Sequence, residues 1–323
     1  MRLLIFQSRE YLKIERMKTN NNTVSSWPEL EFLHMQDTLE TLHQWIQIVG
    51  KIRLKTMPWQ NQSWHTTLYI TSNGFSTHGI PYQGRNFQID FDFRKHQLTI
   101  QCSDTADVVM GLYSRTVADF YTELFEKLEH IGVYVEIHPR PNELEPAIPF
   151  KENTVNKTYD PKAAVALWQA MLKAHEVFTQ FRSQFVGKAS PVHLFWGAFD
   201  LAVSRFSGKK APLHPGGMPN MPLGVMQEAY SQEVSSAGFW PGSKDSPNPV
   251  FYSYVYPTPA SYAKQKVRPE QSYYSPEMGE FFLNYSDVQK AGNPEKMLYD
   301  FLESTYSAAA ISANWDREVL EKS

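Results

Sequence analysis

Residues 87–93 read FQIDFDF, the most regular alternation of apolar and polar side chains in the chain. A period of two places the apolar side chains on one face of an extended strand. These side chains are Phe87, Ile89, Phe91 and Phe93. Residues 94–97 predict a turn, after which Leu98, Ile100 and Cys102 repeat the alternation. The stretch therefore predicts a β-hairpin, and with it an antiparallel sheet.

Helices and further strands flank this hairpin. Asp37 is placed to cap a helix that ends near Leu54. Thr116 is placed to cap a second helix, which Gly132 ends. The sequence also predicts strands at 64–71, 107–112 and 133–138. We expect an antiparallel sheet with two helices packed on one face.

The second half of the chain is richer in helices. A proline-rich stretch, residues 139–149, is the best linker candidate. Asp160 and Pro161 begin a predicted helix that runs to about residue 186. Asn293 and Pro294 begin another, which runs to about residue 315. Further strands are predicted at 227–237 and 250–256. The predicted fold class is α+β: an antiparallel sheet with two helices, followed by a helix-rich half with additional strands.

This organisation predicts three parts. Residues 1–26 form a mobile N-terminal extension, because their polar tract buries too little apolar surface to offset the entropy of ordering. Residues 27–145 form an α+β sheet domain. Residues 146–323 form a helix-rich α+β domain packed on the first. Met17 offers an alternative start to Met1.

The composition excludes several classes of protein. The chain carries 31 basic and 34 acidic side chains, for a net charge of −3. Proteins that coat nucleic acid usually show a clear basic excess, so a nucleic-acid partner is not expected. No apolar run approaches the roughly 18 residues of a membrane span. Cys102 is the only cysteine, which excludes an intrachain disulfide and favours a reducing compartment. We therefore expect a soluble, cytoplasmic protein.

Motifs of established chemistry are absent from the sequence. It contains no GxSxG elbow, no Walker loop, no GxGxxG and no paired CxxC. The sequence therefore predicts no metal site and leaves any cofactor unknown.

Residues 187–208, GKASPVHLFWGAFDLAVSRFSG, predict a buried helix. Ser190 and Pro191 are placed to begin it, and Gly208 to end it. Apolar side chains cover most of the helical circumference, which leaves one narrow polar strip. The strip holds His193, Gly197, Asp200 and Ser204, with Trp196 at its edge. Because buried polar groups need partners, we expect the strip to face a ligand or other polar groups of the protein.

Two interpretations of this strip stay open. His193 and Asp200 lie seven residues apart, roughly 10 Å along a helix, which is too far for both to bind one metal ion. A ligand that lies across Gly197 fits this spacing. Alternatively, the strip hydrogen-bonds to a neighbouring strand, and Gly197 lets that strand approach closely.

A second candidate region comprises residues 228–242, EAYSQEVSSAGFWPG, and the strand that follows at 250–256. Neither face of the first stretch is convincingly apolar. In the second, Tyr252, Tyr254 and Tyr256 share a face and can line a pocket with apolar walls and hydroxyl groups. The alternative is a sheet face that covers the core and holds the tyrosine hydroxyls in water.

These residues support two classes of function and leave open whether the protein is an enzyme. The first class is an enzyme or small-molecule binder, with a pocket around His193, Asp200 and the tyrosine strands. His193 is then the general acid or base, and Asp200 or Glu228 orients it. Lys188 and Arg205 hold an anionic group. The other ligand-binding residues are Trp196, Gly197, Ser204, Tyr230, Trp240, Tyr252 and Tyr254. The second class is a non-catalytic interaction or structural protein, in which the same polar residues specify the core.

Several long stretches resemble a family of uncharacterised bacterial proteins of about this length, classified as a domain of unknown function. The stretches are LHQWIQIVGKIRL (42–54), GRNFQIDFDF (84–93), FVGKASPVHLFWGAFDLAVSRFSG (185–208), EAYSQEVSSAGFWPG (228–242) and FYSYVYP (251–257). The resemblance covers residues 27–315. It implies a bacterial origin and a single family unit, but no activity and no catalytic residue. Residues 1–26 and 216–226 depart from it.

Overall fold

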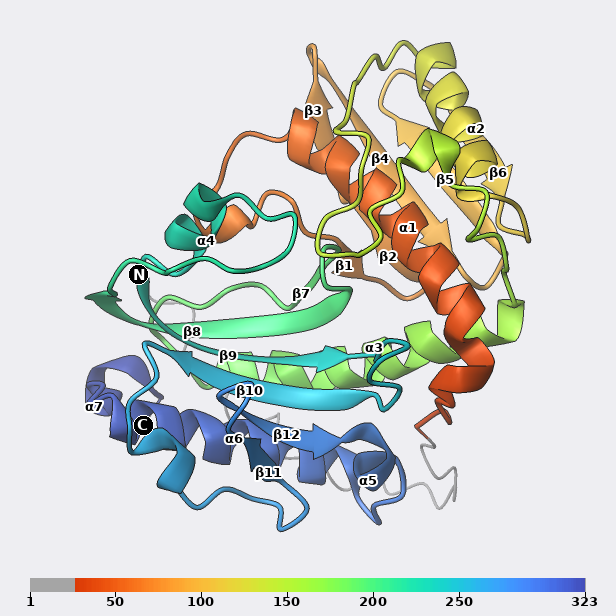
Figure 1. Ribbon diagram of the computed structural model, residues 1–323. Helices are drawn as coiled ribbons and strands as arrows, with labels where there is room; N and C mark the ends of the chain where they lie inside the picture. Colours follow the sequence, from red (N-terminus) through yellow and green to blue (C-terminus); the bar gives the residue numbers. More distant parts are fainter. Residues whose placement is uncertain (1–26, 323) are drawn as a thin grey trace, which may run out of the picture.

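Two antiparallel sheets, with helices packed on them, build residues 27–322, the part of the chain that this computed structural model describes (Figure 1). The predicted α+β class is confirmed. The predicted N-terminal extension, residues 1–26, lies outside the described residues.

The first sheet contains the hairpin predicted from residues 87–102. Its strands are β1 (Tyr69–Ile70), β2 (Gly74–Ser76), β3 (Ile80–Tyr82), β4 (Arg85–Asp92), β5 (Gln97–Cys102) and β6 (Thr105–Gly111). They are ordered β1-β2-β4-β5-β6, and β3 pairs with β4 as well. The four alternating apolar side chains of residues 87–93 are buried, as predicted. They face α1 (Phe32–Thr56) and α2 (Val117–His130), which pack together on this sheet (Figure 1). The hydroxyl of Thr116 accepts a hydrogen bond from the backbone N–H of Asp119, which confirms the predicted cap.

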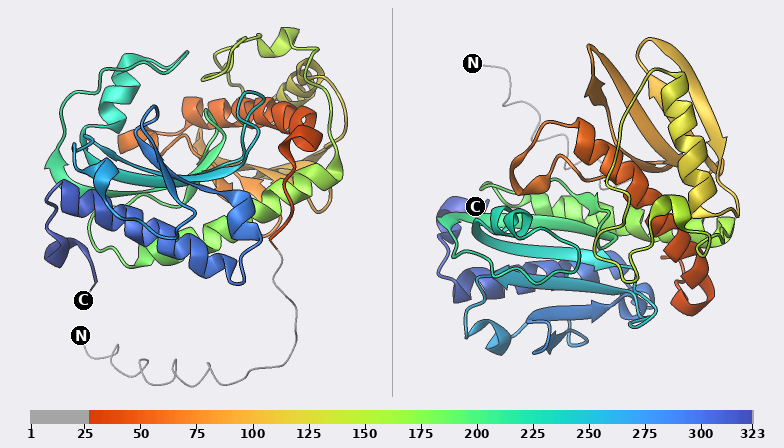
Figure 2. Two further views of the ribbon diagram at one scale, coloured as in Figure 1. Left: turned by 60° about the horizontal axis from the view of Figure 1, so that its bottom comes forward. Right: turned by 45° about the horizontal axis from the view of Figure 1, so that its top comes forward.

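The second sheet lies below the first in Figure 1. Its strands are β7 (His193–Phe195), β8 (Asp200–Lys210), β9 (Gln232–Trp240), β10 (Val250–Tyr256), β11 (Tyr273–Ser275) and β12 (Glu280–Asn284), in the order β11-β12-β10-β9-β8-β7. The long helices α3 (Pro161–Ser183) and α6 (Pro294–Ser312) lie side by side and cover one of its faces (Figure 2). The shorter elements are α4 (Leu223–Ala229), α5 (Tyr285–Gln289), α7 (Arg317–Leu320), and the 3-10 turns η2 (Asn61–Ser63), η3 (Phe150–Glu152) and η4 (Tyr262–Lys264).

The two sheets are joined through short edge strands. Leu68 and Leu194 exchange backbone hydrogen bonds of 2.9 and 2.7 Å, beside β1 and within β7. Helices α1 and α3 also touch, and one connected cluster of buried apolar side chains runs from Trp27 to Leu320. The division into domains at residues 145 and 146 stays a prediction.

The predicted helix over residues 187–208 is wrong. This stretch forms the β7–β8 hairpin, in which residues 196–199 make the turn. In β8, Leu201 and Val203 are buried on one face and Phe206 on the other, because protein covers both faces of the strand. An apolar run that is buried on all sides fits a helix or a strand equally well. Gly197 and the β-branched Val203 belong to the turn and the strand, respectively.

Two other strand predictions need correction. Residues 133–138 are a loop, and of residues 64–71 only Tyr69–Ile70 form a strand. In addition, β9 begins at Gln232, because residues 223–229 form the short helix α4.

Candidate functional site

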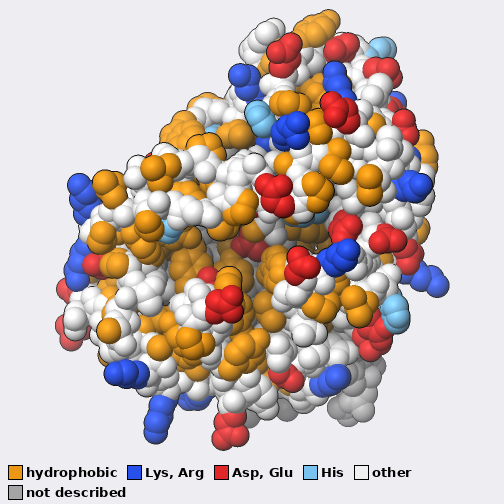
Figure 3. Space-filling model, viewed as in Figure 1, with side chains coloured by type: hydrophobic (Ala, Val, Ile, Leu, Met, Phe, Trp, Pro, Cys, Tyr) orange, Lys and Arg blue, Asp and Glu red, His pale blue; other side chains and the backbone are white. Residues whose placement is uncertain are grey.

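Helices α3 and α6 cover one face of the second sheet, and within residues 27–322 no long helix covers the other. The register places Ala202, Gly238 and Tyr252 side by side across β8, β9 and β10. Side chains at alternate positions share a face, so Asp200 and Tyr254 lie on the face of Tyr252. The molecule is hollowed in front of β8 and β9, and hydrophobic and acidic side chains gather there (Figure 3). We call Glu143, Asp200, Tyr230, Tyr252, Tyr254 and Glu280 the acid–tyrosine face.

Asp200 is buried at the start of β8 and is bound by a tyrosine. The hydroxyl of Tyr252 donates a hydrogen bond to Oδ2 of Asp200. Tyr252 extends over Gly238 to reach it, since a Cβ at that glycine would lie 2.3 Å from the Tyr252 hydroxyl. Burial raises the pKa of Asp200 to about 6, although the hydrogen bond from Tyr252 opposes this shift.

Two more carboxyl groups lie close enough to interact with Asp200. Glu143 comes from the loop at residues 139–149, and Glu280 begins β12. Burial raises the pKa of each to about 7, and the negative charge of Asp200 adds to the shift. Because burial and the Asp200 charge both disfavour ionisation of the two glutamates, these acids can hold protons close to neutral pH.

Hydrogen bonds to α1 hold the loop at 139–149 and thereby position Glu143. Gln47 and Asn142 exchange two hydrogen bonds of 2.8 Å, and Lys51 donates to the Asn142 side chain. Glu143 itself has a φ of 58°, a conformation that costs energy for a residue other than glycine. Its carboxylate lies against Gly197, where a Cβ would be 1.9 Å from Oε1. The close approach predicted at Gly197 is therefore present, and the approaching segment is this loop.

The β7–β8 turn is held from the same helix. Nε2 of His43 lies 2.9 Å from the carbonyl oxygens of both Trp196 and Gly197. Because carbonyl oxygens only accept, this nitrogen carries the ring proton. The His43 ring also stacks on Phe199, and burial lowers the pKa of His43 to about 4. A neutral histidine thus fixes the turn that leads into Asp200.

Tyrosine rings form the rest of the face. The hydroxyls of Tyr230 and Tyr254 lie 2.9 Å apart, and the rings of Tyr252 and Tyr254 lie 6.2 Å apart. The pKa of Tyr230 is raised by burial and further by the charges of Glu280, Asp200 and Glu143. All three acids therefore act on one tyrosine. Ser204, also on this face, binds Ser236 through their hydroxyls at 2.9 Å.

His193 is buried apart from the acids. Its Nδ1 lies 3.0 Å from the Thr67 hydroxyl, and its Nε2 has no partner within residues 27–322. Burial lowers the pKa of His193 to about 3, helped by the positive charges of Arg53 and Arg182. The structure brings His193 and Asp200 onto neighbouring strands, but no hydrogen bond joins them in the described chain.

Lys188 links η2 to β9, and Glu228 links η2 to α4. Nζ of Lys188 donates to the side-chain oxygens of Gln62 and Gln232 at 2.7 and 2.9 Å. Oε1 of Glu228 accepts from the backbone N–H of Gln62 at 2.8 Å. Neither residue contacts the three acids through a hydrogen bond or ion pair within residues 27–322.

The two predicted tryptophans lie at the margins of this region. The indole N–H of Trp196 donates to the Thr66 carbonyl at 2.8 Å, and its ring packs on Gly50. Trp240 ends β9, opposite Val250. Trp196 therefore helps to anchor the turn to α1.

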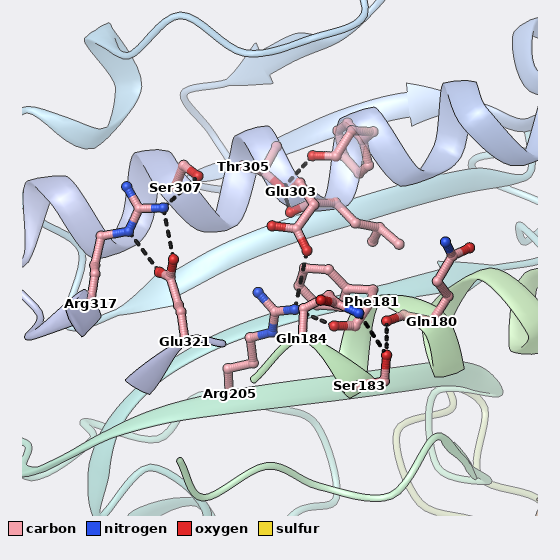
Figure 4. Close-up of polar contacts among 12 residues, drawn as sticks. Gln180, Phe181, Ser183, Gln184, Arg205, Glu303, Thr305, Ser307, Arg317 and Glu321 are labelled. Atoms are coloured by element: carbon pink, nitrogen blue, oxygen red, sulfur yellow. Dashed lines mark hydrogen bonds and ion pairs between the residues drawn. The ribbon is translucent and has the colours of Figure 1, made fainter. Parts of the chain in front are cut away.

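Arg205 lies on the opposite face of the second sheet, behind the acid–tyrosine face. Its guanidinium donates to the Phe181 carbonyl and, at 3.2 Å, to Glu303 (Figure 4). The guanidinium carbon also lies 3.4 Å from the centre of the Phe181 ring and 4.3 Å from that of Tyr306. Arg205 thus links β8 to α3 and α6.

Sequence reasoning missed Glu143, Glu280 and His43. Glu143 belongs to a stretch interpreted as a linker, and no strand was predicted at β12. His43 lies inside the first predicted helix. No short motif marks any of the three, because only the tertiary structure brings them to one place.

Comparison with other proteins places the chain in a family. Within residues 27–322, no group of three or more His, Cys, Asp or Glu side chains can hold a metal ion, and no helix has the length and apolar character needed to cross a membrane. No curated protein and no solved structure matches the chain. Residues 27–322 match the family of unknown function DUF5996, so the resemblance to a domain of unknown function is confirmed. The chain belongs to this family.

Proposed function

We propose that the protein binds a small molecule on the acid–tyrosine face and transfers protons to or from it there. The observation that carries this proposal is the buried Asp200–Tyr252 pair on the sheet face that is hollowed in front of β8 and β9 (Figure 3), together with the effect of the Asp200 charge on Glu143 and Glu280. Clefts with apolar walls and a few convergent polar groups are typical ligand sites. A carboxyl group that titrates near neutral pH can both donate and accept a proton.

Asp200 is the best candidate for the acid–base group. Its pKa, raised to about 6, lies near the pH at which a cytoplasmic enzyme works. Glu143 and Glu280 stand beside it as alternative proton carriers, and Tyr252 holds its carboxylate in place. The single cysteine and the near-zero net charge support a cytoplasmic role on a small molecule rather than on nucleic acid.

The alternative is a non-catalytic protein whose buried polar residues specify its core. The internal partners of Arg205 and Lys188 support this reading for those two residues. It does not account for Glu143 and Glu280, which have no hydrogen-bond partner within residues 27–322 and stay partly accessible. Purely structural carboxyl groups are normally paired.

A thermal-shift screen tests the proposed function. Wild type, Asp200→Asn and Tyr252→Phe are melted with a diverse set of metabolites, and Glu277→Gln, an exposed acid on the same segment as Glu280, is the control. A ligand at 100 times its Kd stabilises the native state by about 2.7 kcal/mol. We expect hits that shift wild type and the control but not the two site variants. Hits are then followed by NMR for chemical conversion. The absence of any hit that depends on Asp200 would contradict the proposed function.

A further inference from the structure

On the basis of the proposed function, we propose that the ligand of the acid–tyrosine face is an organic cation: a small molecule with a protonated primary amine on an apolar body. The inference concerns the charge and shape of the ligand, so it can fail while the site itself stands.

In the described part of the chain, the face carries three acids and no positive charge that pairs with them. No Lys, Arg or His nitrogen within residues 27–322 forms an ion pair with Glu143, Asp200 or Glu280. Lys51 of α1, which holds the loop that carries Glu143, donates to the Asn142 side chain. Carboxylates that are buried together repel one another unless a proton or a cation compensates them. An ammonium group supplies that charge and donates up to three hydrogen bonds.

The aromatic part of the face suits the remainder of such a ligand. The ring centres of Tyr230 and Tyr254 lie 6.3 Å apart, and those of Tyr252 and Tyr254 lie 6.2 Å apart. Tyrosine faces attract cations and also cover apolar groups. Acids beside tyrosines therefore match an amine attached to a ring or a hydrocarbon chain.

Other ligand charges fit less well. The described residues offer no set of side chains that can hold a metal ion. An anion would need a free cation, but Lys188 binds two glutamine side chains and Arg205 lies behind the sheet. A neutral ligand would supply no charge to the acids and would leave protons alone to compensate their repulsion.

A set of three probes of matched shape tests this inference. Benzylamine, benzyl alcohol and benzoate differ mainly in charge, and ligand-observed NMR titrations measure their Kd values at pH 7. We expect benzylamine to bind wild type about tenfold or more tightly than the other two. Glu143→Gln, Asp200→Asn and Glu280→Gln should each weaken benzylamine binding by about tenfold. The control Glu277→Gln should leave it unchanged.

The pH dependence gives an independent readout. The groups that face the acids are Tyr230, Tyr252 and Tyr254, while His43 and Lys51 of α1 hold the adjoining turn and loop. The tyrosines stay neutral because their pKa values are raised, and His43 stays neutral because its pKa is lowered to about 4. Of these groups, only the acids change charge between pH 5 and 7. As the pH rises through this range, the Kd of benzylamine should fall about tenfold per pH unit for each proton that benzylamine displaces from the acids. The titration is repeated in His214→Gln, because His214, whose pKa is lowered by burial, stacks on Tyr230 with ring centres 4.4 Å apart.

The outcomes separate the two proposals. If benzyl alcohol or benzoate binds as tightly as benzylamine and Asp200→Asn abolishes that binding, the cation inference is wrong and the proposed function stands. Benzylamine binding that all three acid variants retain would also overturn the inference. If benzylamine does not bind and every Asp200-dependent hit of the thermal-shift screen is neutral or anionic, the inference fails in the same way. Glu143→Gln is the acid variant that we expect to fold as wild type does, because Glu143 has no hydrogen-bond partner within the described residues. A change in benzylamine binding in this variant therefore does not come from misfolding.

Discussion

Burial shifts the pKa values of Asp200 and His193 in opposite directions, because it favours the neutral form of each side chain. It raises the pKa of the Asp200 acid to about 6 and lowers that of the His193 imidazole to about 3. Near pH 7, Asp200 can therefore still exchange a proton, whereas His193 stays neutral. The proposed acid–base role consequently falls to Asp200 rather than to the histidine that the sequence favours.

Tyr252→Phe tests the pairing of Tyr252 with Asp200. The hydrogen bond from Tyr252 stabilises the charged form of Asp200, so its loss should raise the Asp200 pKa further above 6. NMR titration of the Asp200 carboxyl carbon measures this change. Tyr273→Phe is the matched control, because Tyr273 is exposed on β11. An Asp200 pKa that is unchanged or lower in Tyr252→Phe would show that the pair does not form.

Local signals in the sequence predict the hairpin and three of the helix caps correctly, but the cap predicted at Asp37 is wrong, because α1 begins at Phe32. The alternation at 87–93 and the caps Thr116, Asp160 and Asn293 all depend on neighbouring residues, and all are found in the structure. The β7–β8 hairpin was missed for a physical reason. Protein covers both of its faces, so its sequence lacks the alternation of a half-exposed strand.

Gly197 connects the turn of this hairpin to the Glu143 loop. In Gly197→Ala, the new Cβ would lie 1.9 Å from Oε1 of Glu143 and should push the flexible carboxylate into water. We expect the Glu143 pKa to fall from about 7 toward its ordinary value of 4.5, with little loss of stability. NMR titration of Glu143 measures this change. Gly224→Ala, where a Cβ meets open space, should leave the Glu143 pKa unchanged. A Glu143 pKa that stays near 7 in Gly197→Ala would contradict the close approach.

The candidate site belongs to the whole molecule rather than to any one segment. It takes Glu143 from a loop, Asp200 from β8, Tyr230 from the end of α4, Tyr252 from β10 and Glu280 from β12. The sequence marks Asp200 and the tyrosines as polar groups in apolar surroundings, and that signal is local. It carries no comparable mark for Glu143, because which loop lies over the sheet face opposite α3 and α6 depends on the packing of both sheets.

Stability should depend on pH through two opposing sets of groups. His43 and His193 have pKa values lowered to about 4 and 3, so below pH 6.5 the unfolded chain takes up protons that the native state does not. Their effect is that stability falls as the pH drops from about 6.5. The three acids have raised pKa values, so between about pH 4 and 7 the native state retains protons that the unfolded chain has lost. Their effect is that stability falls as the pH rises through this range.

The triple variant Glu143→Gln/Asp200→Asn/Glu280→Gln isolates the second effect. Its free energy of unfolding relative to wild type should rise between pH 4 and 7 and level off above pH 7. The total rise should be on the order of 2–3 kcal/mol, less than three independent shifts would give, because the acids are coupled. Urea denaturation at pH 4, 5.5, 7 and 8 measures this difference, and Glu277→Gln should follow wild type throughout. A difference that does not change with pH would mean that the acids are not held neutral in the native state, and the proposed proton transfer would lose its physical basis.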